Sequence, residues 1–261
     1  MNKEKMIPLS LLLLSTFMLF MGFSYQSIEK RVQSYSYSDK EEYDNLNDSI
    51  KLIESLPIHI NIMNQYFSSV SNLDEKLQEE IILAYAIKNR YKTYNCSDGY
   101  HKSICINKED LNSHDLQRTF NTNITFTNET IDVNLDYYGK LKAKTDSYTS
   151  YYKIDLNNYI ERYTKHSDFY KFKKDNDKYI VYVYEGYYES NCTPNTKIVL
   201  KDFLDPNKTI EGTCSQKRLF SSEYEMGDFQ LYKYELSKNQ NNEFYLTGYN
   251  PVNKEGVKDT K

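Results

Sequence analysis

An uncharged, apolar run near the start of the chain constrains its fold more than any other stretch. No charged residue occurs from Ile7 to Phe23, whereas Lys3 and Lys5 precede the run. A helix of these 17 residues is about 26 Å long, close to the ~30 Å hydrocarbon core of a bilayer. The run therefore predicts a transmembrane helix, which would place the rest of the chain on one side of a membrane.

Two outcomes are open for this run: a signal anchor retained over residues 1–25, or a secretory signal that is cleaved. A cleaved signal normally has an apolar run of about 7–15 residues and then a small-x-small cleavage site. This run is longer, and Gly22-Phe23-Ser24 matches such a site poorly. We favour the single-pass anchor, with membrane attachment through Ile7–Phe23, and keep secretion after cleavage as the alternative.

Four cysteines favour an extracellular location for the C-terminal domain: Cys96, Cys105, Cys192 and Cys214. Their number is even and they form no C-x-x-C pair, so their spacing disfavours zinc and thioredoxin-like sites. Three disulfide connectivities are open, and four reduced thiols are the alternative to all of them. Because Cys96/Cys105 and Cys192/Cys214 each bracket a polar loop, we expect disulfides between sequence neighbours.

Charge and motif content narrow the classes of function. The net charge is −4 at pH 7 and the basic residues are scattered, so no basic field is present to hold nucleic acid. The four histidines form neither H-x-x-x-H nor H-E-x-x-H, and no G-x-S-x-G or G-x-G-x-x-G motif occurs. We therefore assign no catalytic, cofactor-binding or metal-ligating residue and expect no cofactor.

The middle of the chain begins with helical periodicity. Residues 26–37 form a polar stalk without a clear apolar period. Apolar residues at spacings of three and four predict helices from Ser38 to Pro57, from Leu73 to Tyr91 and from Lys108 to Phe120. Asn72, with Glu three residues later, is the expected N-cap of the second helix.

After residue 120 the apolar period becomes two, which predicts strands. The candidate strands are Ile131–Leu135, Tyr148–Ile154, Phe169–Phe172, Tyr179–Tyr188, Ile198–Phe203, Phe229–Leu236 and Phe244–Tyr249. Helices followed by strands predict an α+β domain over residues 38–252, with the helices packed on one face of a single, mostly antiparallel sheet. We expect the helix Leu73–Tyr91 to pack on the late strands, and residues 253–261 to form a disordered tail.

Four segments carry a resemblance to known proteins: the anchor Ile7–Phe23, the helix Leu73–Tyr91, the strand Tyr179–Tyr188 and the closing hairpin Tyr232–Tyr249. Together they resemble a diffuse group of uncharacterised membrane-anchored or secreted extracytoplasmic proteins of low-GC Gram-positive bacteria. The resemblance is one of pattern and composition. It implies a small sheet under a helix, as in cystatin-like or nuclear-transport-factor-like layouts, and it transfers no catalytic residue.

Tyrosine is unusually frequent, at 27 residues, while Trp is absent. A low-GC genome explains this composition most simply, and a tyrosine-rich binding surface is the alternative. By strand parity, Tyr182, Tyr184 and Tyr188 share one side of a strand, and Tyr148 and Tyr152 share one side of another. Cross-strand aromatic pairs stabilise sheets, so these rings either serve packing or form a stacking platform for a glycan or an extended peptide.

The sequence thus predicts a non-enzymatic, membrane-anchored extracytoplasmic domain that binds a protein or a cell-envelope component. A hydrolase of cell-wall glycan or peptide is the alternative, since two catalytic carboxyl groups need not be close in sequence. A cleft with two carboxyl groups about 5–10 Å apart favours the hydrolase. A shallow aromatic groove or a bare sheet face favours binding.

Overall fold

The computed structural model describes residues 40–57, 60, 66–97, 99, 102–122, 126, 129–134, 140–145, 148–156, 163–189, 197–213, 227–253 and 257. The predicted anchor and stalk lie outside these residues. The chain divides into two compact units, Met1–Asn47 and Asp48–Lys261. No helix within the described ranges combines the length and the apolarity that crossing a membrane requires.

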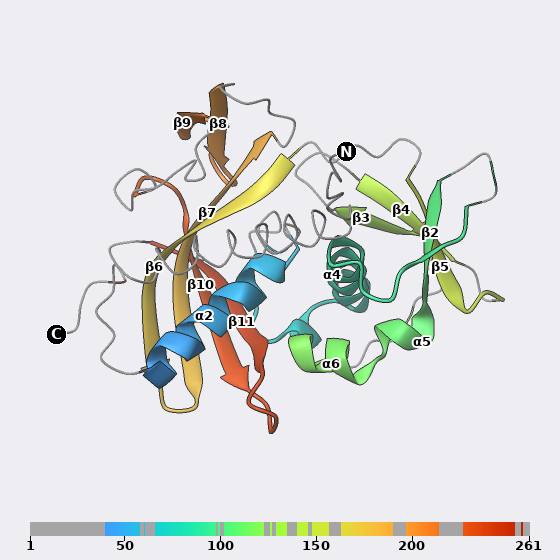
Figure 1. Ribbon diagram of the computed structural model, residues 1–261, viewed down its shortest axis with the longest axis horizontal. Coiled ribbons are helices and arrows are strands. Elements are labelled where there is room, and N and C mark those ends of the chain that lie inside the picture. The colour runs from blue at the N-terminus through green and yellow to red at the C-terminus, as the bar shows by residue number, and fades with distance from the viewer. Residues whose placement is uncertain are drawn as a thin grey trace, which may run out of the picture. The chain divides into compact units, whose positions relative to one another are not determined.

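The fold is α+β, and its described strands pair in antiparallel fashion in two sheets (Figure 1). The first sheet has five strands in the order β1-β2-β5-β4-β3, which are Tyr94–Asn95 (β1), Ser103–Asn107 (β2), Ile131–Asn134 (β3), Lys140–Lys144 (β4) and Tyr151–Asp155 (β5). The expectation of a single sheet is therefore wrong. Alternation shows that a strand has an inner and an outer side, but it does not show which strands pair.

The second sheet has six strands, in the order β11-β10-β7-β8-β9, with β6 also paired to β7. Its strands are Tyr163–Asp175 (β6), Lys178–Glu189 (β7), Lys197–Asp202 (β8), Thr209–Thr213 (β9), Leu231–Lys238 (β10) and Phe244–Val252 (β11). Gly186 of β7 is paired with Asp202 of β8. A Cβ atom there would come within 2.6 Å of the Lys201 carbonyl oxygen, so only glycine fits.

The helices depart from the sequence expectation at their ends. They are Lys40–Ser55 (α2), the 3-10 turn Val70–Asn72 (η1), Glu75–Lys88 (α4), Lys108–Leu111 (α5) and His114–Phe120 (α6). The expected helix Lys108–Phe120 is interrupted between α5 and α6. Asp74, not Asn72, caps α4, because its carboxylate accepts a hydrogen bond from the Lys76 N–H at 3.0 Å.

Helix α4 covers the five-stranded sheet, where it contacts β3. Four consecutive residues, Ile81 to Ala84, are buried, so the helix is enclosed on more than one side. The sheet presents an aliphatic inner face to this core: Ile104, Ile106, Ile131, Val133, Leu141, Ala143 and Ile154. The expectation that this helix packs on the late strands is wrong, since its main strand contact is β3.

In the six-stranded sheet, β7 is buried on both of its faces. One face carries a cluster formed by Tyr182, Tyr184, Ile198, Leu200, Phe229, Leu231 and Val257. Val257 belongs to the segment expected to form the tail, yet it is buried in this cluster. On the other face Tyr249 stacks on Phe67 and Tyr232, with ring centroids 5.7 and 5.6 Å apart.

A buried ion pair lies within the six-stranded sheet. The Lys165 ammonium is 3.0 Å from the Glu185 carboxylate, and the two side chains are 7% and 0% exposed. Ser167 and Tyr234 donate to the two carboxylate oxygens at 2.9 and 2.6 Å. The charge of Glu185 is thus balanced and hydrogen-bonded, as a buried carboxylate requires.

The end of α2 is fixed by side chains from two other elements. Lys165 of β6 donates to the Ile53 carbonyl at 3.1 Å. Lys88, at the end of α4, donates to the carbonyls of Glu54 and Leu56 at 2.8 and 2.7 Å. The last carbonyls of a helix lack i+4 partners within it, so these lysines supply donors there, and two positive charges at a helix C-terminus are favourable.

Candidate functional site

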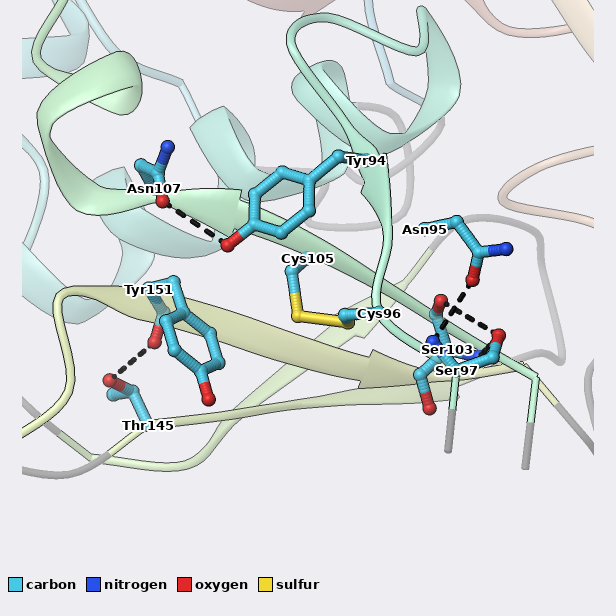
Figure 2. Close-up of a disulfide and its surroundings, with 9 residues drawn as sticks. All are labelled: Tyr94, Asn95, Cys96, Ser97, Ser103, Cys105, Asn107, Thr145 and Tyr151. Carbon is cyan, nitrogen blue, oxygen red and sulfur yellow. Dashed lines mark hydrogen bonds between the residues drawn. A yellow bond between two sulfur atoms is a disulfide. The ribbon is translucent and has the colours of Figure 1, made fainter. Parts of the chain in front are cut away.

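The predicted Cys96–Cys105 disulfide is confirmed (Figure 2). It closes the β1–β2 hairpin, in which Tyr94 is paired with Cys105, and its Cα atoms are 5.8 Å apart. Cys192 and Cys214 lie outside the described residues, so their pairing stays a prediction. A disulfide of this kind fits an extracellular location.

The three tyrosines expected on one side of β7 are mostly enclosed. Tyr182 and Tyr184 are only 9% and 1% exposed and belong to the core cluster, while Tyr188 is half-buried and packs against it. Burial raises the pKa of the Tyr188 hydroxyl, against the opposing effect of a hydrogen bond with Thr164. A stacking platform needs exposed rings, and within this set only Tyr188 has appreciable exposed surface.

The other two predicted tyrosines are placed differently from each other. Tyr148 is 96% exposed and precedes β5, whereas Tyr152 is fully buried within β5 and donates a hydrogen bond to Glu79 of α4. Because Tyr148 lies outside β5, the alternation of side chains along a strand does not place it on the same side as Tyr152. Tyr151 instead shares the outer face with Tyr94 near the disulfide (Figure 2). Four of the five predicted rings therefore lie in two different sheets and the fifth, Tyr148, lies before β5, so they do not form one face.

A polar hollow of about 530 Å³ lies between the start of α4 and the end of α6. The described residues that line it are all polar: Ser71, Glu75, Gln78, Gln117, Arg118, Asn121 and Thr122. The first three come from η1 and α4, and the other four come from α6 and the residues just after it. Its volume lies in the range of about 300–1,000 Å³ typical of small-molecule sites.

One side chain of this hollow holds its two walls together. Gln78 is buried, and its amide donates to the carbonyls of Ser71 and Leu73 at 3.3 and 2.8 Å. Its carbonyl oxygen accepts from the Thr122 hydroxyl at 2.9 Å. Gln78 and Thr122 are thus engaged with each other and with backbone, and they fix the geometry of the hollow.

Three other side chains that line the hollow make no described side-chain hydrogen bond. Glu75, Gln117 and Asn121 have no side-chain hydrogen-bond partner among the residues that the structure describes. Glu75 lies in the first turn of α4, where the helix dipole favours a negative charge. Asn121 ends α6 in the left-handed conformation, at φ 49°. One carboxylate and two amides are therefore available to hydrogen-bond with a ligand.

Arg118, on the α6 wall of the hollow, already forms an ion pair. Its guanidinium is 3.1 Å from the Glu243 carboxylate, in the turn between β10 and β11. When the Asn241 side chain is oriented with its amide oxygen toward Arg118, that oxygen accepts hydrogen bonds from the two guanidinium Nη atoms at 2.9 and 3.0 Å. Arg118 thus connects α6 to this turn, and its positive charge is balanced outside the hollow.

The sequence did not point to this hollow, because its two walls are about 40 residues apart and carry no motif. Within the described ranges, no three potential metal ligands come together. Comparisons of the chain with protein-family models, curated proteins and solved structures find no match. The chemistry of the hollow therefore rests on its own residues, which offer hydrogen bonds and one unbalanced negative charge.

Proposed function

We propose that this chain is a non-enzymatic extracytoplasmic binding protein, anchored in the membrane through Ile7–Phe23, that holds a polar cell-envelope component in the hollow between α4 and α6. The apolar run and its poor cleavage site support the anchor. The Cys96–Cys105 disulfide supports an external location. A cystatin-like or nuclear-transport-factor-like layout would apply to the five-stranded sheet under α4.

The observation that carries the proposal is the composition of the hollow. Among the residues that the structure describes, its lining consists of hydroxyl, amide and carboxylate side chains and the Arg118 guanidinium, with no aromatic ring. Such groups match the hydroxyl and amide groups of saccharides and peptides, because each polar group of the ligand then finds a partner. Cell-envelope glycans and their peptides supply many such groups, so they are the ligand class that we favour.

A cell-wall hydrolase is the alternative, and the lining supports it less. Hydrolysis of a glycosidic bond normally uses two carboxyl groups on either side of the bond. Among the described lining residues one carboxylate occurs, that of Glu75, and the carboxylate paired with Arg118 is that of Glu243. Release of soluble fragments from cell walls by the pure protein would favour the hydrolase over a binding role.

Cosedimentation tests the proposal directly. The full chain in detergent should sediment with peptidoglycan sacculi of a low-GC Gram-positive bacterium. Gln117→Trp fills the hollow without removing a described side-chain hydrogen bond, and it should weaken binding by about tenfold or more. Gln240→Trp is the matched control, because Gln240 is exposed in the β10–β11 turn and does not line the hollow. Equal binding by both variants would overturn the proposed site.

Membrane attachment has its own test. Carbonate-washed membranes should retain the protein, and protease added to intact cells should digest its C-terminal domain. A shortened, soluble form in the medium would show instead that the apolar run is a cleaved signal.

A further inference from the structure

We infer that the hollow takes a ligand bearing a primary ammonium group, which pairs with the carboxylate of Glu75; this inference rests on the proposed function of the hollow. The ligand class is an amine-bearing cell-envelope component rather than a neutral saccharide or an anionic polymer.

The charge balance of the lining carries the inference. Two of the seven lining residues are charged, Glu75 and Arg118. Arg118 is neutralised by Glu243 at 3.1 Å, while Glu75 has no partner among the described residues. Among the described lining residues, the Glu75 carboxylate is thus the one charge that is not paired with an opposite side-chain charge. A cationic ligand group would balance it, whereas a phosphate or carboxylate would be repelled.

The chemical groups of the neighbouring side chains suit the same ligand. An ammonium group has three donors and needs three acceptors. Glu75 supplies carboxylate oxygens, and the uncommitted amides of Gln117 and Asn121 add acceptor oxygens from the opposite wall. The amide N–H groups remain for hydroxyl or carbonyl oxygens of the same ligand. A charge-assisted hydrogen bond to Glu75 would then be the strongest single contact.

Two cell-envelope sources carry this chemistry. One is an amino sugar whose nitrogen is not acetylated, and the other is the side-chain amine of a basic amino acid in a wall peptide. Both present the same ammonium group on a polar carrier. Acetylation of the nitrogen removes the charge in either case, which gives matched pairs of probes.

Calorimetric titration of the full chain in detergent tests the inference with four probes: a glucosamine tetramer, its fully N-acetylated form, a lysine-containing wall tripeptide and its Nε-acetylated form. We expect one amine-bearing probe to bind at least about tenfold more tightly than its acetylated form, as a hydrogen bond to a charged group implies. Which of the two binds identifies the source. Glu75→Gln should abolish the preference for the amine.

Glu109→Gln is the matched control, because Glu109 is an exposed residue in the first turn of α5 that does not line the hollow. It should keep the full preference. Equal binding of amine and acetylated probes, or an unchanged preference in Glu75→Gln, would overturn the ammonium inference. If Gln117→Trp still abolishes binding in that case, the hollow remains the binding site and only the ligand class is wrong. Failure of all four probes would also overturn the inference, and cosedimentation would then decide separately on the proposed function.

Discussion

The two sheets of this protein bury their strands in different ways. The five-stranded sheet has one aliphatic face under α4, while exposed residues such as Asp132, Lys142 and Lys144 occupy the other face. In the six-stranded sheet, β7 is covered on both faces, and tyrosine rings with a buried ion pair fill much of the interior. The first arrangement relies mainly on apolar burial, with a buried contact between Tyr152 and Glu79, and the second depends more on satisfying buried polar groups.

This difference has an energetic consequence. An aliphatic core tolerates loss of part of a side chain at the cost of a cavity. A buried carboxylate that loses its partner instead keeps an unbalanced charge. We therefore expect the six-stranded sheet to be the more sensitive of the two to single polar substitutions.

The largest effect is expected at the buried ion pair. Lys165→Met removes the partner of Glu185 and should lower the free energy of unfolding by about 3–5 kcal/mol, measured by urea denaturation. Lys173→Met, on the same strand, is the control and should change it by less than about 0.5 kcal/mol. The double variant Lys165→Met/Glu185→Leu should recover much of the loss. A small effect of the single variant would contradict the difference between the sheets.

Removing the disulfide measures how much it stabilises the five-stranded sheet. Replacing Cys96 and Cys105 together with serine should cost about 2.5–3 kcal/mol, from the entropy of a loop closed over a sequence separation of 9. Thermal unfolding of the double variant measures this loss. A loss above that of Lys165→Met would mean that the hairpin, and not the buried charge, dominates stability.

A third test examines a buried polar contact in the core of the five-stranded sheet. Tyr152→Phe removes the hydroxyl that donates to buried Glu79 and should cost about 1–3 kcal/mol. Tyr151→Phe is the matched control on the outer face and should have almost no effect. Equal losses in the two variants would show that the Glu79 contact does not stabilise the interface between α4 and β5.

The smallest effect concerns Glu235 of β10. Burial by itself raises the pKa of this carboxyl, but hydrogen bonds and charges from Lys233 and Lys178 outweigh it and hold the pKa below its ordinary value. A folded-state pKa below the unfolded one stabilises the protein above the unfolded pKa, and this stability is lost as the pH falls through the folded value. Because the Glu235 side chain is still 23% exposed and solvent weakens the charge interactions, the contribution should be about 0.2–1 kcal/mol. Glu235→Gln should therefore be less stable than the parent at pH 7 and equal to it in acid.

Local patterns predicted part of this fold well. Alternation in Ile131–Asn134 and the two closing strands indicated real strands, and the spacing of Cys96 and Cys105 indicated a real disulfide. The α+β class followed from the same patterns. These features depend on residues that are near one another in sequence.

Features that depend on distant contacts were not predictable in this way. The continuous apolar character of β7 is typical of a strand buried on both faces, which leaves no outer side for a binding platform. Strand parity left packing and an exposed platform both open for Tyr152, and only the contact with Glu79 of α4 shows that it serves packing. The hollow arises from the packing of α4 against α6 and the hydrogen bond between Gln78 and Thr122, which no sequence spacing reveals.

The most direct test of the proposed binding site is a crystal structure of the full chain in detergent, grown with a disaccharide–peptide fragment of peptidoglycan. We predict electron density for the fragment in the hollow, in contact with Glu75, Gln117 and Asn121. A fragment bound on the outer face of the five-stranded sheet, beside Tyr94 and Tyr151, with the hollow empty, would contradict the proposed site.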